Sequence, residues 1–312
     1  MQQDHIELKQ RRDIGEIIAV YFDFFKKNLK PFINIFIRYN GIFLLGFLGV
    51  SYLLVTGFIG MMRSTQSTIG GTAVTETIDS SMYLGFGALG FFALLIITSI
   101  LNYSLAASYS IEYQKKDTPE VEKKKVWGLV SKYLGKIILF VIVAGLLFLV
   151  VFVIGMIISF IPVLGTFAYY ALQLGFLAWM GLAFMAMLYE NRDLMDAISE
   201  GWNLLFKYFW KSVLVNLVVS LLLSILLMVV LMIPGILIGI YAFFSLEAGV
   251  DLAESAVAKV VWTLAGTIVL IVYTFNQSLS QFVNSVLYFS IHEQTYNQVT
   301  RSKIDQIGAT IE

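Results

Sequence analysis

The stretch that decides the fold is residues 137–189, IILFVIVAGLLFLVVFVIGMIISFIPVLGTFAYYALQLGFLAWMGLAFMAMLY, which contains no Asp, Glu, Lys or Arg. A helix that spans a bilayer needs about 20 mainly apolar residues, so this stretch is long enough for two. Pro162 cannot continue a helix, and Gly165 tolerates a chain reversal. The stretch therefore predicts two membrane spans joined by a tight turn at residues 161–165.

Four further uncharged stretches are each long enough for one span. They are residues 39–62, 80–111, 212–246 and 260–292. The composition agrees, because 58% of the residues are hydrophobic and 13% are charged, whereas soluble domains have roughly 45–50% and 25%. The sequence predicts an all-α integral membrane protein with six transmembrane helices.

Pro162 and Pro234 lie at corresponding positions of two uncharged stretches. Pro234-Gly235 leaves too few residues for another span, so we expect one span to about Ile233 and then a bent or interfacial extension. Interrupted spans hold substrate sites in some transporters. These prolines should lie near the outer boundary, which favours ordinary helix breaks.

The Lys and Arg residues indicate the topology. With six spans and a cytoplasmic N-terminus, all but Arg63 and Lys259 of the 21 Lys and Arg residues fall on the inside, as the positive-inside rule requires. We therefore expect both termini in the cytoplasm. The first long apolar stretch begins after nearly 40 residues, so we expect no cleavable signal peptide.

Three segments ahead of the odd-numbered spans share one spacing: an aromatic residue, a lysine five residues later and a second lysine after four more. They are Tyr21, Lys26, Lys30; Trp127, Lys132, Lys136; and Trp202, Lys207, Lys211. Lysines spaced i, i+4 share a helix face and can reach headgroups, while the aromatic ring suits the water–lipid boundary. The pattern predicts three amphipathic elbow helices at the inner surface, with an affinity for anionic lipids.

Each even-numbered span ends in a glutamate, namely Glu112, Glu190 and Glu293. Together with the elbow helices, this predicts a single membrane domain over residues 1–312. It is built from three repeated units of an elbow helix plus a transmembrane hairpin, 14–112, 121–190 and 197–293, followed by a cytoplasmic tail, 294–312. We expect pseudo-threefold packing of the units, a flexible outer loop over 63–82 and a short surface helix within 247–259.

The last span is the most polar. Its cytoplasmic half is crowded with amide and hydroxyl residues, among them Asn276, Gln277, Ser280, Gln281, Asn284 and Ser285. Gln277, Gln281 and Asn284 share a helix face with Ser280, so this face should point into the bundle rather than at lipid. It is either a hydrophilic path or ligand cavity, or a set of interhelical hydrogen bonds with Asn102, Thr98, Ser99 and Asn216 as partners.

Candidate catalytic and metal-binding residues are few. The chain has no cysteine and two histidines, His5 and His292, and no zinc-protease, nucleophile-elbow or P-loop motif. We expect His292 to cap the last span beside Glu293 or to sense pH with it, and His5 to be mobile. We therefore predict no catalytic, cofactor-binding or metal site and no enzyme activity, and the neutral charge predicts no nucleic-acid binding.

The longest inner loop carries a lysine run of Lys115, Lys116 and Lys123–Lys125. Such a run is typical of a solvated loop that fixes topology. The competing interpretation is a docking surface for a cytoplasmic partner or for anionic headgroups.

Several short motifs resemble a bacterial family of multi-pass membrane proteins, the glycerophosphoryl diester phosphodiesterase membrane-domain type, and related domains of unknown function. They are Tyr189-Glu190, residues 196–204 ahead of Lys207 and Trp210, and Ile233-Pro234-Gly235. The C-terminal runs 288–294 and 304–308 are similar to uncharacterised members from Bacteroidetes-type bacteria.

The resemblance implies no catalytic role, because the phosphodiesterase chemistry of the namesakes belongs to a separate soluble domain. In the Bacteroidetes-type relatives, neighbouring genes often encode a MoxR-like ATPase. We therefore expect a non-enzymatic component that binds partner proteins or helps to assemble a complex in the bilayer. The alternative is a transporter or lipid-handling protein that uses the polar face of the last span.

Overall fold

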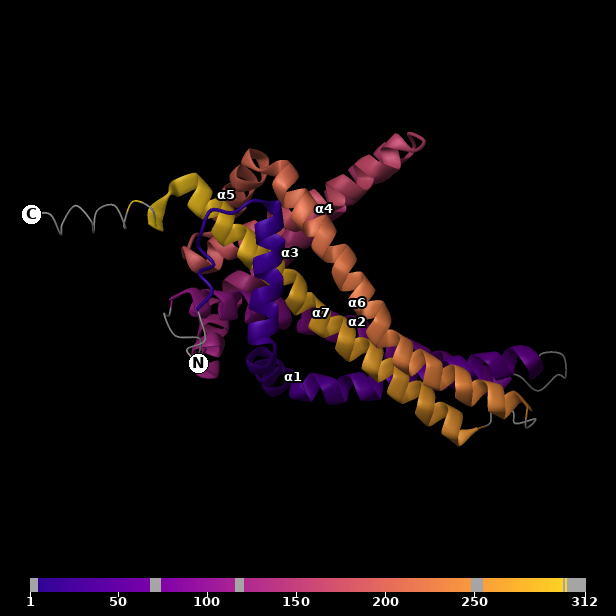
Figure 1. The fold of residues 1–312 in the computed structure, drawn as a ribbon. Helices are drawn as coiled ribbons and strands as arrows, with labels where there is room; N and C mark the ends of the chain where they lie inside the picture. The colour runs from indigo at the N-terminus through magenta and orange to yellow at the C-terminus, as the bar shows by residue number, and fades with distance from the viewer. Residues whose placement is uncertain (1–4, 68–73, 116–120, 248–254, 300, 302–312) are drawn as a thin grey trace, which may run out of the picture. The chain divides into compact units, whose positions relative to one another are not determined.

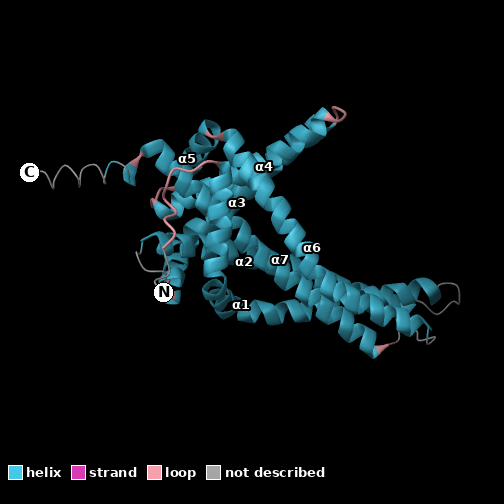
Figure 2. Ribbon diagram, in the orientation of Figure 1, coloured by secondary structure: helices cyan, strands magenta, loops and turns pink. Residues whose placement is uncertain are grey.

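The computed structural model describes residues 5–67, 74–115, 121–247, 255–299 and 301, and these are helical almost throughout, with no strand among them (Figure 2). The seven helices are α1 (Ile14–Ser67), α2 (Val74–Lys115), α3 (Lys123–Ser159), α4 (Leu164–Tyr189), α5 (Leu194–Lys207), α6 (Phe209–Glu247) and α7 (Ala256–Tyr296). All except α5 are long and apolar enough to cross a membrane. The predicted all-α membrane class and the six long apolar helices are confirmed.

The chain divides into two compact units. Unit 1 consists of Met1–Ile35, Ile100–Leu222 and Ser278–Glu312, and unit 2 of Phe36–Ser99 and Leu223–Gln277. Helices α1, α2, α6 and α7 each contribute to both units, whereas α3, α4 and α5 belong to unit 1 alone (Figure 1). The candidate functional residues lie mainly in unit 1.

Helices α3 and α4 form the hairpin that the uncharged stretch predicts (Figure 1). Helix α3 ends at Ser159, and Val163 turns the chain with a φ of 63°. A Cβ at Gly165 would lie 2.1 Å from the carbonyl oxygen of Ile158. Only glycine allows this approach of the two backbones, so the tight turn at 161–165 is confirmed together with its cause.

Helix α5 is the one elbow that forms a separate helix. Its inner face packs on α4, and a Cβ at Gly201 would meet the backbone nitrogen of Ala183 at 2.6 Å. Trp179 of α4 donates its indole N–H to the carbonyl of Ile198 at 2.9 Å. The opposite face of α5 exposes Trp202 together with Met195 and Phe206, which suits a helix at the lipid boundary.

Aromatic rings form the core of unit 1. Phe32 and Phe282 meet edge to face with ring centroids 4.7 Å apart, and Phe24 and Phe282 do so at 5.5 Å. Tyr109 closes the group against Phe32 at 5.5 Å and donates its hydroxyl to Asn28 at 2.7 Å. Such edge contacts add about 0.5–1.5 kcal/mol per pair beyond burial, so α1, α2 and α7 are firmly joined here.

In unit 2, small residues bring α1 and α2 into close contact. A Cβ at Gly57 would lie 2.7 Å from the backbone nitrogen of Leu84, and one at Gly60 would lie 2.7 Å from the Cβ of Ser80. Close backbone approach at small residues is the usual means of helix packing in lipid, where no hydrophobic effect drives the helices together.

Several expected boundaries differ. Helix α1 runs through the first elbow and its span, with Pro31 inside it, and α3 runs through the second elbow and its span. Helix α6 continues through Pro234 to Glu247 rather than breaking there. A proline removes only one backbone hydrogen bond, and neighbouring groups can replace it in a membrane helix.

The predicted connections are shorter than expected. The loop at 63–82 is largely helical, since α1 reaches Ser67 and α2 begins at Val74. Residues 68–73, 116–120, 248–254, 300 and 302–312 lie outside the described residues, and with them Lys116, most of the segment 247–259 and the run 304–308.

Candidate functional site

Glu190 is the centre of a partly buried polar cluster in unit 1. It follows the last residue of α4, where Asn191 with a φ of 55° turns the chain back. Its Oε1 accepts hydrogen bonds from the Tyr288 hydroxyl and from Nε2 of His292, the latter at 2.8 Å. Its Oε2 lies 2.5 Å from Nε of Arg192. The end of α4 is therefore tied to α7 by hydrogen bonds that all converge on one carboxylate.

A second carboxylate extends the cluster to α5. Glu200 is 4% exposed, and its Oε2 lies 3.2 Å from Nη1 of Arg192. Its Oε1 accepts the hydroxyl of Tyr296 at 2.7 Å. Arg192 thus bridges two carboxylates from different helices, and removal of one partner would leave a buried charge uncompensated.

The charge state of the cluster follows from these contacts. Burial alone would raise the pKa of Glu190, but the hydrogen bonds from His292, Tyr288 and Arg192 outweigh it and lower the pKa from 4.5 to about 2. Burial lowers the pKa of Arg192, and Glu190 and Glu200 together raise it above its usual value. Glu190 and Arg192 therefore form an ion pair throughout the physiological pH range.

His292 and Glu293 are neighbours in the sequence, but the carboxylate seen against the His292 ring is that of Glu190. His292 is buried against Glu190, while the carboxylate of Glu293 accepts the backbone N–H of Val299 at 3.0 Å. Glu190 and His292 are 102 residues apart, so their pairing had no local signal. The glutamates that recur at the ends of the even-numbered spans were the one available hint.

An N-terminal segment, residues 5–13, crosses the ends of several helices of unit 1, and we call it the strap. Nε2 of His5 lies 3.1 Å from the carbonyl oxygen of Tyr113, and the two rings stack at 4.6 Å. The Tyr113 hydroxyl accepts the N–H of Ile6 at 3.0 Å, and Oε1 of Gln114 accepts the N–H of Leu8 at 3.0 Å. These contacts connect His5 and the residues after it to the end of α2.

The strap also reaches α7 and buries two basic side chains. Nζ of Lys9 donates to Gln298 at 2.7 Å and lies over the ring of Tyr189. Arg12 folds back on its own segment and donates to the carbonyl oxygens of Leu8, at 2.9 Å, and Glu7. Burial lowers the pKa of Arg12, and Glu7 counteracts this. The strap is thus a bonded part of unit 1.

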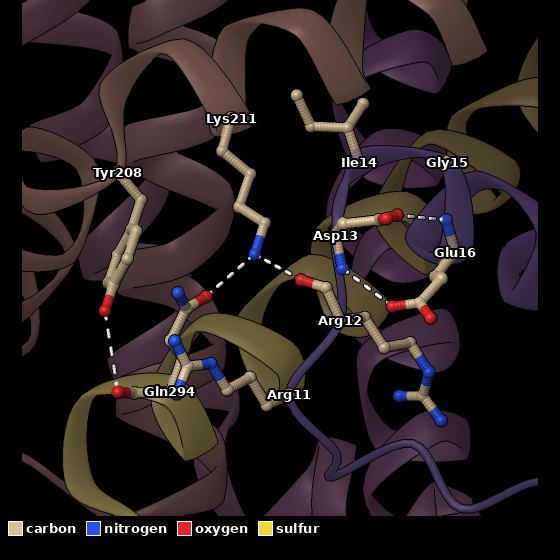
Figure 3. A pocket seen from close by; sticks show the side chains of 9 residues that line it. All are labelled: Arg11, Arg12, Asp13, Ile14, Gly15, Glu16, Tyr208, Lys211 and Gln294. Atoms are coloured by element: carbon tan, nitrogen blue, oxygen red, sulfur yellow. Dashed lines mark hydrogen bonds between the residues drawn. The ribbon is translucent and has the colours of Figure 1, made fainter.

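A polar pocket of about 730 Å³ opens between the strap and the ends of α6 and α7 (Figure 3). It is lined by Arg11, Arg12, Asp13, Ile14, Gly15, Glu16, Tyr208, Lys211 and Gln294. Nζ of Lys211 donates to the carbonyl oxygen of Arg12 and to Oε1 of Gln294, the latter at 2.7 Å, while the Tyr208 hydroxyl lies 3.5 Å from the Gln294 carbonyl oxygen. Lys211 therefore holds the strap by a hydrogen bond and also lines the pocket.

The pocket presents charges of both signs. The backbone N–H of Glu16 donates to Oδ1 of Asp13, and the N–H of Asp13 donates to Glu16 Oε2, each at 2.8 Å. This capping box starts α1 and uses one oxygen of each carboxylate. Arg11 is exposed and Lys211 half-buried, so the pocket suits a polar ligand that carries acidic and basic groups.

The predicted polar face of α7 is fully buried only in its C-terminal part. Gln281 and Asn284 have no exposed area, whereas Asn276, Gln277 and Ser280 are half-buried. The expectation that this face points inward holds for the first two and only in part for the others. Among the expected partners in unit 1, the carbonyl oxygen of Asn102 accepts a hydrogen bond from the Ser278 hydroxyl of α7 at 3.4 Å.

The other expected partners turn to their own helices. Thr98 and Ser99 donate to the carbonyl oxygens of Leu94 and Leu95, and Asn216 donates to that of Ser212 at 3.0 Å. Ser, Thr and Asn side chains in helices commonly bond the carbonyl four residues back. Thr98, Ser99 and Asn216 are therefore seen bonded within their own helices rather than to α7.

The predicted interfacial anchors separate into two groups. Trp127 and Trp202 are exposed, as are Lys26, Lys30, Lys132 and Lys207, which suits contact with lipid. The other three are bonded within unit 1. Tyr21 is buried and lies 3.4 Å from the carbonyl oxygen of Leu279, Lys136 pairs with Asp193 at 2.9 Å, and Lys211 braces the strap.

Comparison of the chain with family models, curated protein sequences and solved structures found no match. Within the part of the chain that the structure describes, no group of three or more His, Asp or Glu side chains is arranged to hold a metal ion.

Proposed function

We propose that the chain is a multi-pass protein of the bacterial inner membrane with both termini in the cytoplasm, and that it is a non-enzymatic component that binds partner proteins. The observation that carries the proposal is the polar pocket beside Lys211. The strap, α6 and α7 all contribute to it, so it is a feature of the assembled unit and not of one surface helix.

The contacts of the cluster around Glu190 support binding rather than catalysis. The carboxylate of Glu190 is engaged by three side chains and Glu200 by two. Residues so fully bonded are poorly placed to exchange protons with a substrate. They instead tie the end of α4 and helix α5 to α7.

The nature of the partner follows from the lining. Arg11 can pair with an acidic side chain of a partner, and the free oxygens of Asp13 and Glu16 can pair with basic ones. The proposal retains the resemblance to the phosphodiesterase membrane-domain family, the three repeated units and the contact of the exposed lysines with anionic lipids. A MoxR-like ATPase system is a candidate partner by family association alone.

The test is affinity purification of the tagged, natively expressed chain in a mild detergent, with mass spectrometry of bound proteins and lipids. Arg11→Glu reverses the exposed charge of the pocket, and Arg301→Glu is the matched control at an exposed position outside it. We expect a stoichiometric partner with the wild type and the control, and at least fivefold less with Arg11→Glu. An unchanged yield with Arg11→Glu would remove the pocket as the docking site.

A second candidate function is transport or lipid handling along the polar face of α7. The specific observation in its favour is that the amide groups of Gln281 and Asn284 are buried without hydrogen-bond partners. The purified chain would then move a solute or lipid in liposomes, and replacement of Gln277, Gln281 and Asn284 by Leu would abolish the flux. Equal flux with and without these three amides would exclude this candidate.

A further inference from the structure

Two amide side chains inside unit 1 have no hydrogen-bond partner. Both the nitrogen and the oxygen of Gln281 and of Asn284 are buried and unpaired, and neither residue has any exposed area. A buried polar group without a partner costs about 1–3 kcal/mol. Four such atoms on adjacent turns of one helix are too costly to be explained as packing alone.

Asn284 packs directly against the backbone of α4. A Cβ at Gly181 of α4 would lie 2.2 Å from Cγ of Asn284, so only glycine fits opposite it. Ser285, the next residue, contacts the sulfur of Met185 at 3.3 Å. The α4 residues seen against Asn284 and Ser285 are therefore a glycine and a thioether, neither of which is a strong hydrogen-bonding side chain.

The same face of α7 leads to the Glu190 cluster. With about 100° per residue, Tyr288 and His292 lie within roughly 80° of Gln281 and Asn284 around the helix axis, and Asn284 is about 12 Å along the axis from His292. Nδ1 of His292 is also buried without a partner. A file of hydrogen-bonding groups thus extends from the middle of the span to the junction of α4 and α7.

We propose that this file is a binding site for small uncharged molecules that both donate and accept hydrogen bonds, with water as the simplest of them. Each amide offers donors and an acceptor, so a ligand with both capacities satisfies the four atoms. An ion is disfavoured, because its burial beside Gly181 and Met185 would cost far more than two amides return. The site deepens the second candidate function by naming its substrate class.

The first test uses the unmodified chain in membranes. X-ray radiolysis produces hydroxyl radicals from water wherever it is bound, and these oxidise nearby methionine. Met185 and Met187 both have no exposed area, but only Met185 is seen in contact with Ser285, and Met187 points about 200° away around α4. We expect Met185 to be oxidised at least fivefold faster than Met187. Equal rates would overturn the proposal.

The second test uses the absence of native cysteine. Asn284→Cys places a thiol in the proposed site, and Phe282→Cys places one in the neighbouring aromatic core, where Phe282 is equally buried. We expect methyl methanethiosulfonate, a small uncharged reagent, to modify Asn284→Cys at least tenfold faster, and equal rates would count against the site. Neither test measures transport, so a hydrated site without liposome flux would refute the second candidate function and leave the site standing.

Discussion

Replacement of Glu190 by Gln should be among the most destabilising single polar changes in unit 1. The substitution keeps the shape but removes the charge that His292, Tyr288 and Arg192 engage. The pKa of Glu190 falls from 4.5 to about 2 in the folded chain. At about 1.4 kcal/mol per pKa unit, the surroundings favour the ionised carboxylate by about 3 kcal/mol. We therefore expect the free energy of unfolding of Glu190→Gln at pH 7 to be lower than that of the wild type by about 3 kcal/mol.

The pH dependence follows from the same lowered pKa. A carboxylate whose pKa is lower in the folded than in the unfolded state stabilises the fold at pH values above the unfolded pKa. The contribution of Glu190 is therefore complete above about pH 5 and is lost as the pH falls from 4.5 towards 2. The free energy of unfolding of the wild type should fall in this pH range. That of Glu190→Gln should fall less, because the variant has no carboxylate to protonate at this position, and the difference should equal the contribution of Glu190.

The assay is reversible unfolding in mixed detergent micelles, followed by circular dichroism between pH 7 and pH 3. Glu122→Gln is the control, because Glu122 forms an exposed ion pair with Lys125 at 3.3 Å and such pairs contribute at most about 1 kcal/mol. A loss under 1 kcal/mol for Glu190→Gln, or an acid sensitivity equal to that of the wild type, would refute the reasoning.

Three further predictions concern packing, the strap and the anchors. Gly201→Ala forces α5 away from the backbone of α4 and should destabilise the fold by about 1–3 kcal/mol in the same assay, whereas Gly128→Ala, where a Cβ meets nothing within 4 Å, should be neutral or slightly stabilising. Tyr113→Phe removes the acceptor of the Ile6 N–H and should accelerate amide exchange of the strap severalfold by mass spectrometry, with no change at α5 as the control. Lys132→Glu and Lys207→Glu reverse exposed charges at the lipid boundary and should lower membrane insertion or disturb orientation in topology reporters; reporters identical to those of the wild type would argue against anchoring.

The membrane class and the hairpin turn could be predicted because both depend on local properties. An uncharged stretch as long as 137–189 has no soluble alternative, and Pro162 with Gly165 permits only a turn between its halves. Pro234 has the same local chemistry, but the packing of its helix decides its effect, and α6 runs through it. A proline in a membrane sequence thus marks a possible break, not a certain one.

The candidate site was largely beyond prediction because its partners are distant in sequence. Lys136 and Lys211 match the anchor spacing as well as Lys132 and Lys207 do, yet they bond Asp193 and Gln294 instead of facing lipid. The polar face of α7 was visible from its spacing, but the loss of its expected partners to local backbone bonds was not. Periodicity identifies which residues share a face, and only the fold identifies what that face meets.

The most direct test of the account is the side of the membrane on which the Glu190 cluster and the strap lie. Single cysteines at Asn191 and at Val163, introduced into a chain that has none, are treated with a membrane-impermeant maleimide in intact spheroplasts and after lysis. The account predicts that Val163→Cys at the hairpin turn is labelled in intact spheroplasts and that Asn191→Cys is labelled only after lysis. Labelling of Asn191→Cys in intact spheroplasts would contradict it, because the pocket and its proposed partner would then lie on opposite sides of the membrane.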